Sequence, residues 1–173
     1  MPMFNINCLD KESSNEKDIL EFLQKNETVY NNLSTKEFEH LNIMGYEYST
    51  ATAIDELGLD DELINKLVED YVAQIIRSKA TFLDYLEILQ EQKKTGKQPD
   101  YVNFRELAHK NLGVARNLRI EDAQKLIYEL MTKDDLQYLK NTLDVLIACA
   151  IKLKPKVACE TIKLIEIKSS ISE

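Results

Sequence analysis

FRELAHKNLGVARNLR, residues 104–119, has the periodicity of an amphipathic helix, which we predict over 101–118. One face is apolar and carries Phe104, Leu107, Ala108, Leu112, Ala115 and Leu118. The other face carries Arg105, His109, Gly113 and Arg116, spaced i, i+4, i+8 and i+11. A glycine inside a helix costs about 0.8–1 kcal/mol relative to alanine, so Gly113 needs a compensating role. We therefore expect an exposed His109 with open space one turn away, where another molecule can approach.

The segments around this stretch predict further long helices and few turns. The chain of 173 residues has four glycines and three prolines, too few for the turns of a sheet protein. Apolar residues recur at helical spacing in 61–78, 80–94, 120–131 and 136–153, with Asp100 as an N-cap candidate and Thr132 and Asp135 as another cap. Long helices with short connections favour antiparallel neighbours. We therefore expect an all-α fold, an antiparallel four-helix bundle with extra N-terminal and C-terminal helices.

The two ends of the chain fall outside this bundle. Capping-box patterns at Ser13–Glu16 and Ser34–Glu37 predict two short helices within 15–45, before a linker at 46–59. Pro155 suits the first turn of a last helix. The expected organisation is an N-terminal extension (1–49), a helical bundle (50–153) and a C-terminal helix (154–173).

Composition and charge narrow the classes of partner and compartment. The net charge of −8 opposes binding to nucleic acid and to anionic membranes, and no apolar run is long enough to span a bilayer. No signal peptide is visible, and the three cysteines form no C-x-x-C pair. Reduced thiols and a cytoplasmic location are the simplest expectation.

The motifs exclude several kinds of reaction and leave one histidine as the main candidate for a reactive residue. There is no phosphate-cradling glycine loop and no P-loop, so direct use of ATP is not expected. Two distant histidines without a cysteine cluster predict no metal site, and His40 is expected to be structural or on the surface. A neutral imidazole is a good nucleophile near neutral pH, which makes His109 a candidate phosphoryl acceptor. Arg105, Lys110 and Arg116 could supply positive charge to the phosphoryl group.

Each of these residues also has an ordinary structural interpretation. His109 could be a surface histidine on an amphipathic helix, and the two arginines could belong to a solvated face. Gly113 could be an early C-cap, with the helix ending near residue 112. A buried His109 would instead indicate a helical interaction domain unrelated to signalling.

AHKNLGVARNL, residues 108–118, resembles the signature of histidine-containing phosphotransfer (HPt) domains of two-component phosphorelays. His109 matches the phosphoacceptor of that family, Gly113 the glycine four residues later, and Asn117-Leu118 the end of the signature. The segments on both sides resemble the helices that precede and follow the histidine helix, so the resemblance covers about residues 50–153. It departs from the family at Asn111 and Leu112, which replace a leucine and a lysine, and at Arg119, which replaces a closing glycine.

The resemblance implies a phosphocarrier rather than an ATP-dependent kinase. Its partners would be a response-regulator receiver domain and a hybrid sensor histidine kinase, with no cofactor of its own and Mg²⁺ on the receiver. Leu112 would lie at the rim of the docking surface and Gly113 would allow close approach. Because the family lysine is missing, an adaptor or inhibitor that binds a receiver or kinase without phosphotransfer is the alternative.

Overall fold

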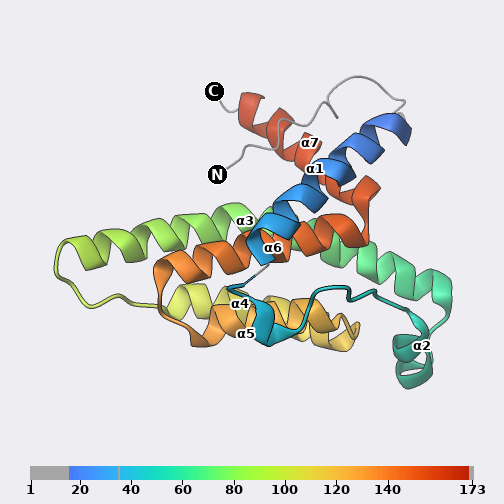
Figure 1. The fold of residues 1–173 in the computed structure, drawn as a ribbon, viewed down its shortest axis with the longest axis horizontal. Helices are drawn as coiled ribbons and strands as arrows, with labels where there is room; N and C mark the ends of the chain where they lie inside the picture. The colour runs from blue at the N-terminus through green and yellow to red at the C-terminus, as the bar shows by residue number, and fades with distance from the viewer. Residues whose placement is uncertain (1–15, 35, 172–173) are drawn as a thin grey trace.

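The computed structural model describes residues 16–34 and 36–171, and in this part of the chain it has seven α-helices, one 3₁₀ helix and no strand. The predicted all-α class is therefore confirmed (Figure 1). None of the helices in these residues is long and apolar enough to cross a membrane. In chain order the elements are α1 (Glu16–Ser34), η2 (Glu39–Leu41), α2 (Ala51–Leu57), α3 (Asp61–Lys94), α4 (Val102–Asn117), α5 (Glu121–Thr132), α6 (Leu136–Leu153) and α7 (Pro155–Ile171).

Helices α3 to α6 contact one another in cyclic order: α3 packs on α4, α4 on α5, α5 on α6, and α6 back on α3. Consecutive helices of this ring run in opposite directions (Figure 1). Each turns an apolar face inward. Among the fully buried side chains at the centre are Ile64, Ile75, Phe82, Phe104, Leu126, Ile127, Leu130, Leu143 and Leu146. Burial of a large apolar side chain contributes about 1.5–3 kcal/mol, so this shared core fixes the orientation of α4.

The first and last helices pack on the same core. Helix α1 contacts α6 and α7, and α7 contacts α3 and α6. On α1 the buried residues Phe22, Asn26 and Tyr30 are spaced by four, and the Asn26 side-chain amide donates to the Ala148 carbonyl of α6 at 2.9 Å. Segments expected to be an extension and a separate last helix thus share one hydrophobic cluster with residues 50–153.

Helix α3 is one continuous helix of 34 residues, where the sequence had suggested two, 61–78 and 80–94. Neither glycine nor proline interrupts residues 78–80, and Ser78 bonds back to the Gln74 carbonyl without ending the helix. The helix begins at Asp60, whose carboxylate accepts from the Leu63 amide, and ends before Gly96. The true break is thus the predicted one at 95–100.

The N-terminal half differs from the expected pair of short helices and linker. Helix α1 alone has 19 residues, Ser34 lies in its last turn, and only the three-residue η2 follows before residue 45. The expected linker contains α2, which ends at Gly58 with a positive φ of 67°. The predicted capping box at Ser13 lies outside the described residues. Ser34, the predicted start of a second helix, is instead the last residue of α1, so the capping pattern coincides with a helix end.

Of the predicted cap pair Thr132 and Asp135, Thr132 is the last residue of α5 and only Asp135 caps a helix start. Asp135 is the N-cap of α6 and accepts from the Tyr138 amide at 2.9 Å, and Pro155 is the first residue of α7. Asp100 accepts from the Val102 amide at 3.0 Å, although the N-cap position itself is Tyr101.

The cysteines divide between two states. Cys149 on α6 is a free, buried thiol, as expected, whereas Cys159 on α7 is disulfide-bonded. The expectation of reduced thiols is therefore wrong for Cys159. Spacing along the chain gives no measure of which sulfur atoms come together in the fold.

Candidate functional site

His109 lies on the exposed side of α4, with one turn of helix on either side of it packed firmly into the core. Phe104, Ala108 and Ala115 hold the opposite face of the helix and are at most 1 % exposed. The imidazole makes no hydrogen bond or ion pair with any residue in the described part of the chain. A rigid helix thus presents a ring whose two nitrogen atoms are uncommitted, so either can act as a nucleophile when neutral.

Gly113 lies within α4, which continues to Asn117, and its φ is not positive. An early C-cap at this residue is thereby excluded. A methyl group built at its Cα meets no atom within 4 Å, so packing inside the chain does not require glycine here. The space one turn after His109 is open to solvent and to an approaching molecule.

Replacing Gly113 by alanine is expected to raise the free energy of unfolding by about 0.8–1 kcal/mol, because alanine has the better helix propensity and meets no clash. Urea unfolding monitored by circular dichroism measures this. Alanine at Gly58 is the matched control and should destabilise, since its φ of 67° strains any side chain. A loss of stability in the Gly113 variant would show that glycine is needed for the fold itself.

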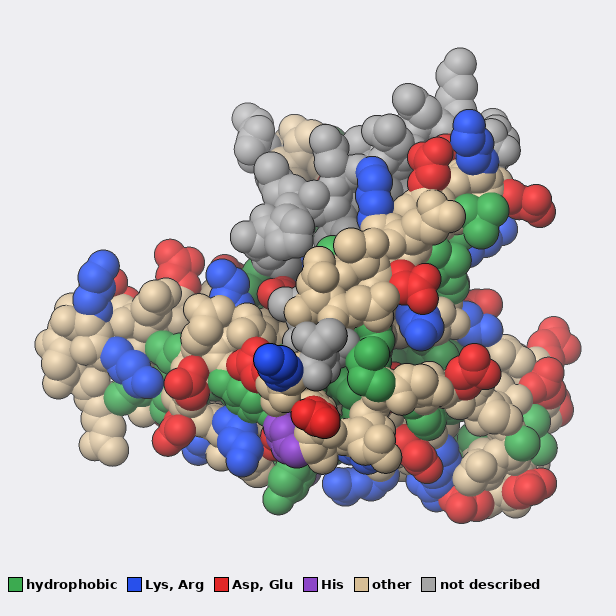
Figure 2. Space-filling view, viewed as in Figure 1, with side chains coloured by type: hydrophobic (Ala, Val, Ile, Leu, Met, Phe, Trp, Pro, Cys, Tyr) green, Lys and Arg blue, Asp and Glu red, His purple; other side chains and the backbone are tan. Residues whose placement is uncertain are grey.

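The basic residues of α4 differ in their exposure to solvent. Lys110 and Arg116 are exposed, whereas Arg105 is half-buried and its guanidinium lies 4.6 Å from the centre of the Tyr101 ring. Residues four apart on a helix have Cβ atoms about 5–6 Å apart, so Arg105 and Gly113 flank His109 by one turn each. Figure 2 shows that acidic, basic and hydrophobic side chains alternate on one face of the molecule, without a large patch of one charge.

Leu112 is 4 % exposed and belongs to the core, as its place in the apolar stripe predicted, so it does not lie at the rim of a docking surface as the resemblance to the HPt signature implied. Its position places it on the α4 face that packs inward with Ala108 and Ala115. Asn111 is fully buried as well. Its amide oxygen accepts from Gln74 of α3 at 3.1 Å, and its amide nitrogen donates to the Leu107 carbonyl at 2.9 Å. The two residues that replace the leucine and lysine of the HPt signature therefore hold α4 in place.

The end of α4 explains the third departure from that signature. Arg119 has a positive φ of 61°, its amide bonds to the Arg116 carbonyl, and the Ile120 amide bonds to the Ala115 carbonyl. This is the helix-ending pattern in which the residue after the cap adopts the left-handed conformation that favours glycine. The Arg119 side chain pairs with Glu56 of α2, a contact that glycine could not make.

Sequence reasoning missed the residues that secure this end from the other side. The Tyr48 hydroxyl donates to the Leu118 carbonyl at 2.7 Å, and the Tyr46 hydroxyl to the Arg119 carbonyl at 3.4 Å. Both tyrosines come from the segment expected to be a linker, about 70 residues earlier in the chain. They satisfy carbonyl groups that a helix end leaves without partners.

His40, the second histidine, is exposed and joins a polar cluster around the buried Glu129. Its Nε2 lies 2.8 Å from Oε1 of Glu129 on α5, and the Tyr138 hydroxyl of α6 donates to the same oxygen at 2.7 Å. Phe38 stacks on Tyr138 with 5.4 Å between ring centres. The cluster ties the η2 turn to α5 and α6, in agreement with the structural role expected for His40. No pattern in the sequence indicates the contact between His40 and Glu129, because 89 residues separate them.

Glu129 makes stability depend on pH. Burial favours the neutral acid, but hydrogen bonds from His40 and Tyr138, together with the charge of Lys133, outweigh it and lower the pKa of Glu129 below its usual 4.5. A carboxyl with a lowered folded-state pKa stabilises the fold above its unfolded pKa and loses that contribution as pH falls. Glu129→Gln should therefore be less stable than wild type at pH 7 by about 1–3 kcal/mol.

The difference in unfolding free energy between the two proteins should shrink once the pH drops below about 4.5 and Glu129 becomes protonated. Urea unfolding at a series of pH values measures it. A difference that stays constant from pH 7 to pH 3 would rule out an ionised Glu129 as the stabilising group.

Comparison of the chain with protein-family models, with curated proteins and with solved structures found no match in any of the three. The site is defined by its own geometry: an exposed imidazole without a hydrogen-bond partner in the described residues, an open position one turn away, and exposed cations on the same helix.

Proposed function

We propose that the chain is a histidine phosphotransfer protein, which relays a phosphoryl group between receiver-domain aspartates through His109. The observation that carries this proposal is the exposed imidazole of His109 beside Gly113, on a helix whose other face is locked in the core. The ring of contacts among α3, α4, α5 and α6 supports an HPt-like four-helix bundle as the frame.

The proposed step moves one phosphoryl group. A lone pair of the neutral His109 ring attacks the phosphorus of an aspartyl phosphate, the P–O bond to the aspartate breaks, and a P–N bond forms. The aspartate leaves as a carboxylate, and the proton on the other ring nitrogen passes to water. Mg²⁺ on the receiver and the exposed cations Lys110 and Arg116 are the groups that would offset the charge of the phosphoryl oxygens.

Gly113 supports a docking role in the same proposal. The residue weakens α4 without any packing need inside the chain, which fits a surface that another backbone approaches closely. Lys110 and Arg116 border this position, and receiver domains that fit it would present a complementary acidic rim.

The alternative is an adaptor or inhibitor that binds a receiver or kinase domain without phosphotransfer. One observation favours it: Leu112 is a buried apolar residue where the HPt signature has a lysine, so no cation at that position assists the phosphoryl group. In that case binding would persist when His109 is replaced.

A panel of phosphorylated receiver domains tests both functions. Each receiver, labelled on its aspartate, is mixed with the protein, and transfer is scored as acid-labile, base-stable label. Transfer from at least one receiver supports the relay. Stable complexes without transfer from any receiver would support the adaptor and reject the relay.

A further inference from the structure

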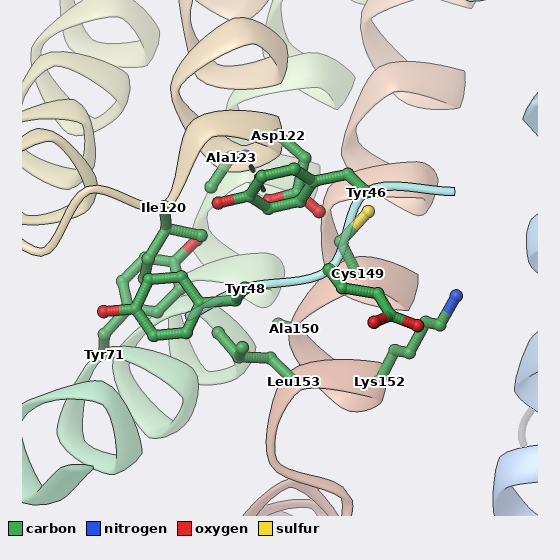
Figure 3. Close-up of a pocket in the computed structure, with 11 residues that line it drawn as sticks. Tyr46, Tyr48, Tyr71, Ile120, Asp122, Ala123, Cys149, Ala150, Lys152 and Leu153 are labelled. Atoms are coloured by element: carbon green, nitrogen blue, oxygen red, sulfur yellow. Dashed lines mark hydrogen bonds between the residues drawn. The ribbon is translucent and has the colours of Figure 1, made fainter. Parts of the chain in front are cut away.

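A cavity of about 280 Å³ lies away from His109, between the 46–48 segment and helices α3, α5 and α6 (Figure 3). Three tyrosine rings, from Tyr46, Tyr48 and Tyr71, make up much of its wall. Ile120 and Leu153 add apolar surface. Typical small-molecule pockets measure about 300–1,000 Å³, so this cavity suits a small ligand.

Two of the tyrosine hydroxyls already donate hydrogen bonds to backbone carbonyls. Tyr48 donates to the Leu118 carbonyl, and Tyr46 donates to the Arg119 carbonyl while accepting from the Glu121 amide at 3.2 Å. What they leave to a ligand is the face of each ring and the remaining lone pair of the Tyr48 oxygen. Aromatic faces and oxygen lone pairs are both regions of negative potential.

Asp122 supplies a carboxylate to the same wall. One of its oxygens accepts from the Ala123 amide at 2.7 Å, drawn as a dashed line in Figure 3, and the Cys149 thiol also bonds to the carboxylate. Burial raises the pKa of Asp122 because these neutral donors compensate only part of its lost hydration.

The cation that lines this cavity, Lys152, partly offsets the charge of Asp122 and also contacts a residue of α1. The Lys152 ammonium lies 5.3 Å from the ring centre of Tyr30 on α1, and Figure 3 shows its side chain directed away from the three tyrosines. Glu47, which is exposed, adds a second negative charge at the edge. The lining residues therefore carry a net negative charge.

Tyr71 adds a polar group without a partner. Its side chain is only 2 % exposed, yet its hydroxyl makes no hydrogen bond with any residue in the described part of the chain. The hydroxyl borders the cavity, so a ligand there could bond to it.

The geometry points to a binding site for a small organic ammonium ion, a primary amine on a short apolar body, in this cavity. The ammonium group would bond to Asp122 and to the Tyr71 oxygen and lie against the faces of Tyr46 and Tyr48, as cations do on aromatic rings. The apolar body would contact Ile120 and Leu153. A neutral ligand would add no counter-charge to the carboxylate beyond the partial one from Lys152.

Benzylammonium and benzyl alcohol form a matched pair of probes, because they have similar size and differ mainly in charge. Isothermal titration calorimetry with the full chain is expected to show saturable binding of benzylammonium at concentrations up to about 10 mM, and at least about 10-fold weaker binding of benzyl alcohol. Equal binding of the two, or no binding of benzylammonium, would overturn the proposal.

Variants separate this cavity from other acidic positions. Asp122→Asn keeps an oxygen for the Ala123 amide and should bind benzylammonium at least about 10-fold more weakly, and Tyr71→Phe about 5-fold more weakly. Glu106→Gln, an exposed acid on α4 outside the cavity, should bind like wild type. Circular dichroism confirms that each variant is folded. Wild-type affinity in a folded Asp122→Asn protein would refute the site, whatever the outcome of the phosphotransfer test.

Discussion

Replacing His109 by glutamine is expected to reduce phosphoryl transfer from a competent phosphorylated receiver to background, a loss of at least about 100-fold. Glutamine has no ring nitrogen that can form the P–N bond, and catalytic nucleophiles typically account for losses of this size or larger. Because the His109 side chain is exposed and makes no hydrogen bond in the described residues, the free energy of unfolding should change by less than about 0.5 kcal/mol.

The matched control is His40→Gln, which removes the chain's other histidine. It should keep phosphoryl transfer, and it should destabilise the fold because Glu129 then loses a hydrogen-bond partner. The two variants thus have opposite expected profiles. Label uptake by the His109 variant at the wild-type rate would eliminate the relay, and uptake lost only in the His40 variant would move the acceptor to the η2 turn.

Replacing Phe104 by alanine is expected to lower the free energy of unfolding by about 3–5 kcal/mol. The ring is 1 % exposed, and its centre lies 5.2 Å from that of Phe82 in an edge-to-face arrangement that joins α4 to α3. The substitution leaves a cavity at the base of the histidine helix and removes the aromatic contact. Urea unfolding gives the change, and phosphoryl transfer should fall as α4 loses its support.

Val102→Ala is the control on the same helix. Val102 is 56 % exposed, so its replacement should change stability by less than about 0.5 kcal/mol. Should Phe104→Ala fail to fold, Phe104→Leu keeps an apolar side chain and should cost less than about 1.5 kcal/mol. Similar values for the Phe104 and Val102 alanine variants would contradict the packing of α4 described above.

Local sequence predicted part of the candidate site. The spacing of Arg105, His109, Gly113 and Arg116 indicated a single outer face, and His109 and Gly113 are both exposed on it. The helical pattern placed Leu112 on the apolar face, and only the resemblance to the HPt signature placed it at the rim of a docking surface. Its 4 % exposure agrees with the pattern, because the residue packs in the core.

Sequence alone determined the helical class, a start of α6 within 132–135 and the start of α7 at Pro155. These features depend on bonds between residues three or four apart and on the few turn-forming residues, so the local sequence contains them. Only the tertiary structure decided that Tyr46 and Tyr48 hold the end of α4, that His40 meets Glu129, and that a cavity forms above Tyr71. Partners that lie 70 to 89 residues apart come together through the path of the whole chain, and no local pattern encodes that path.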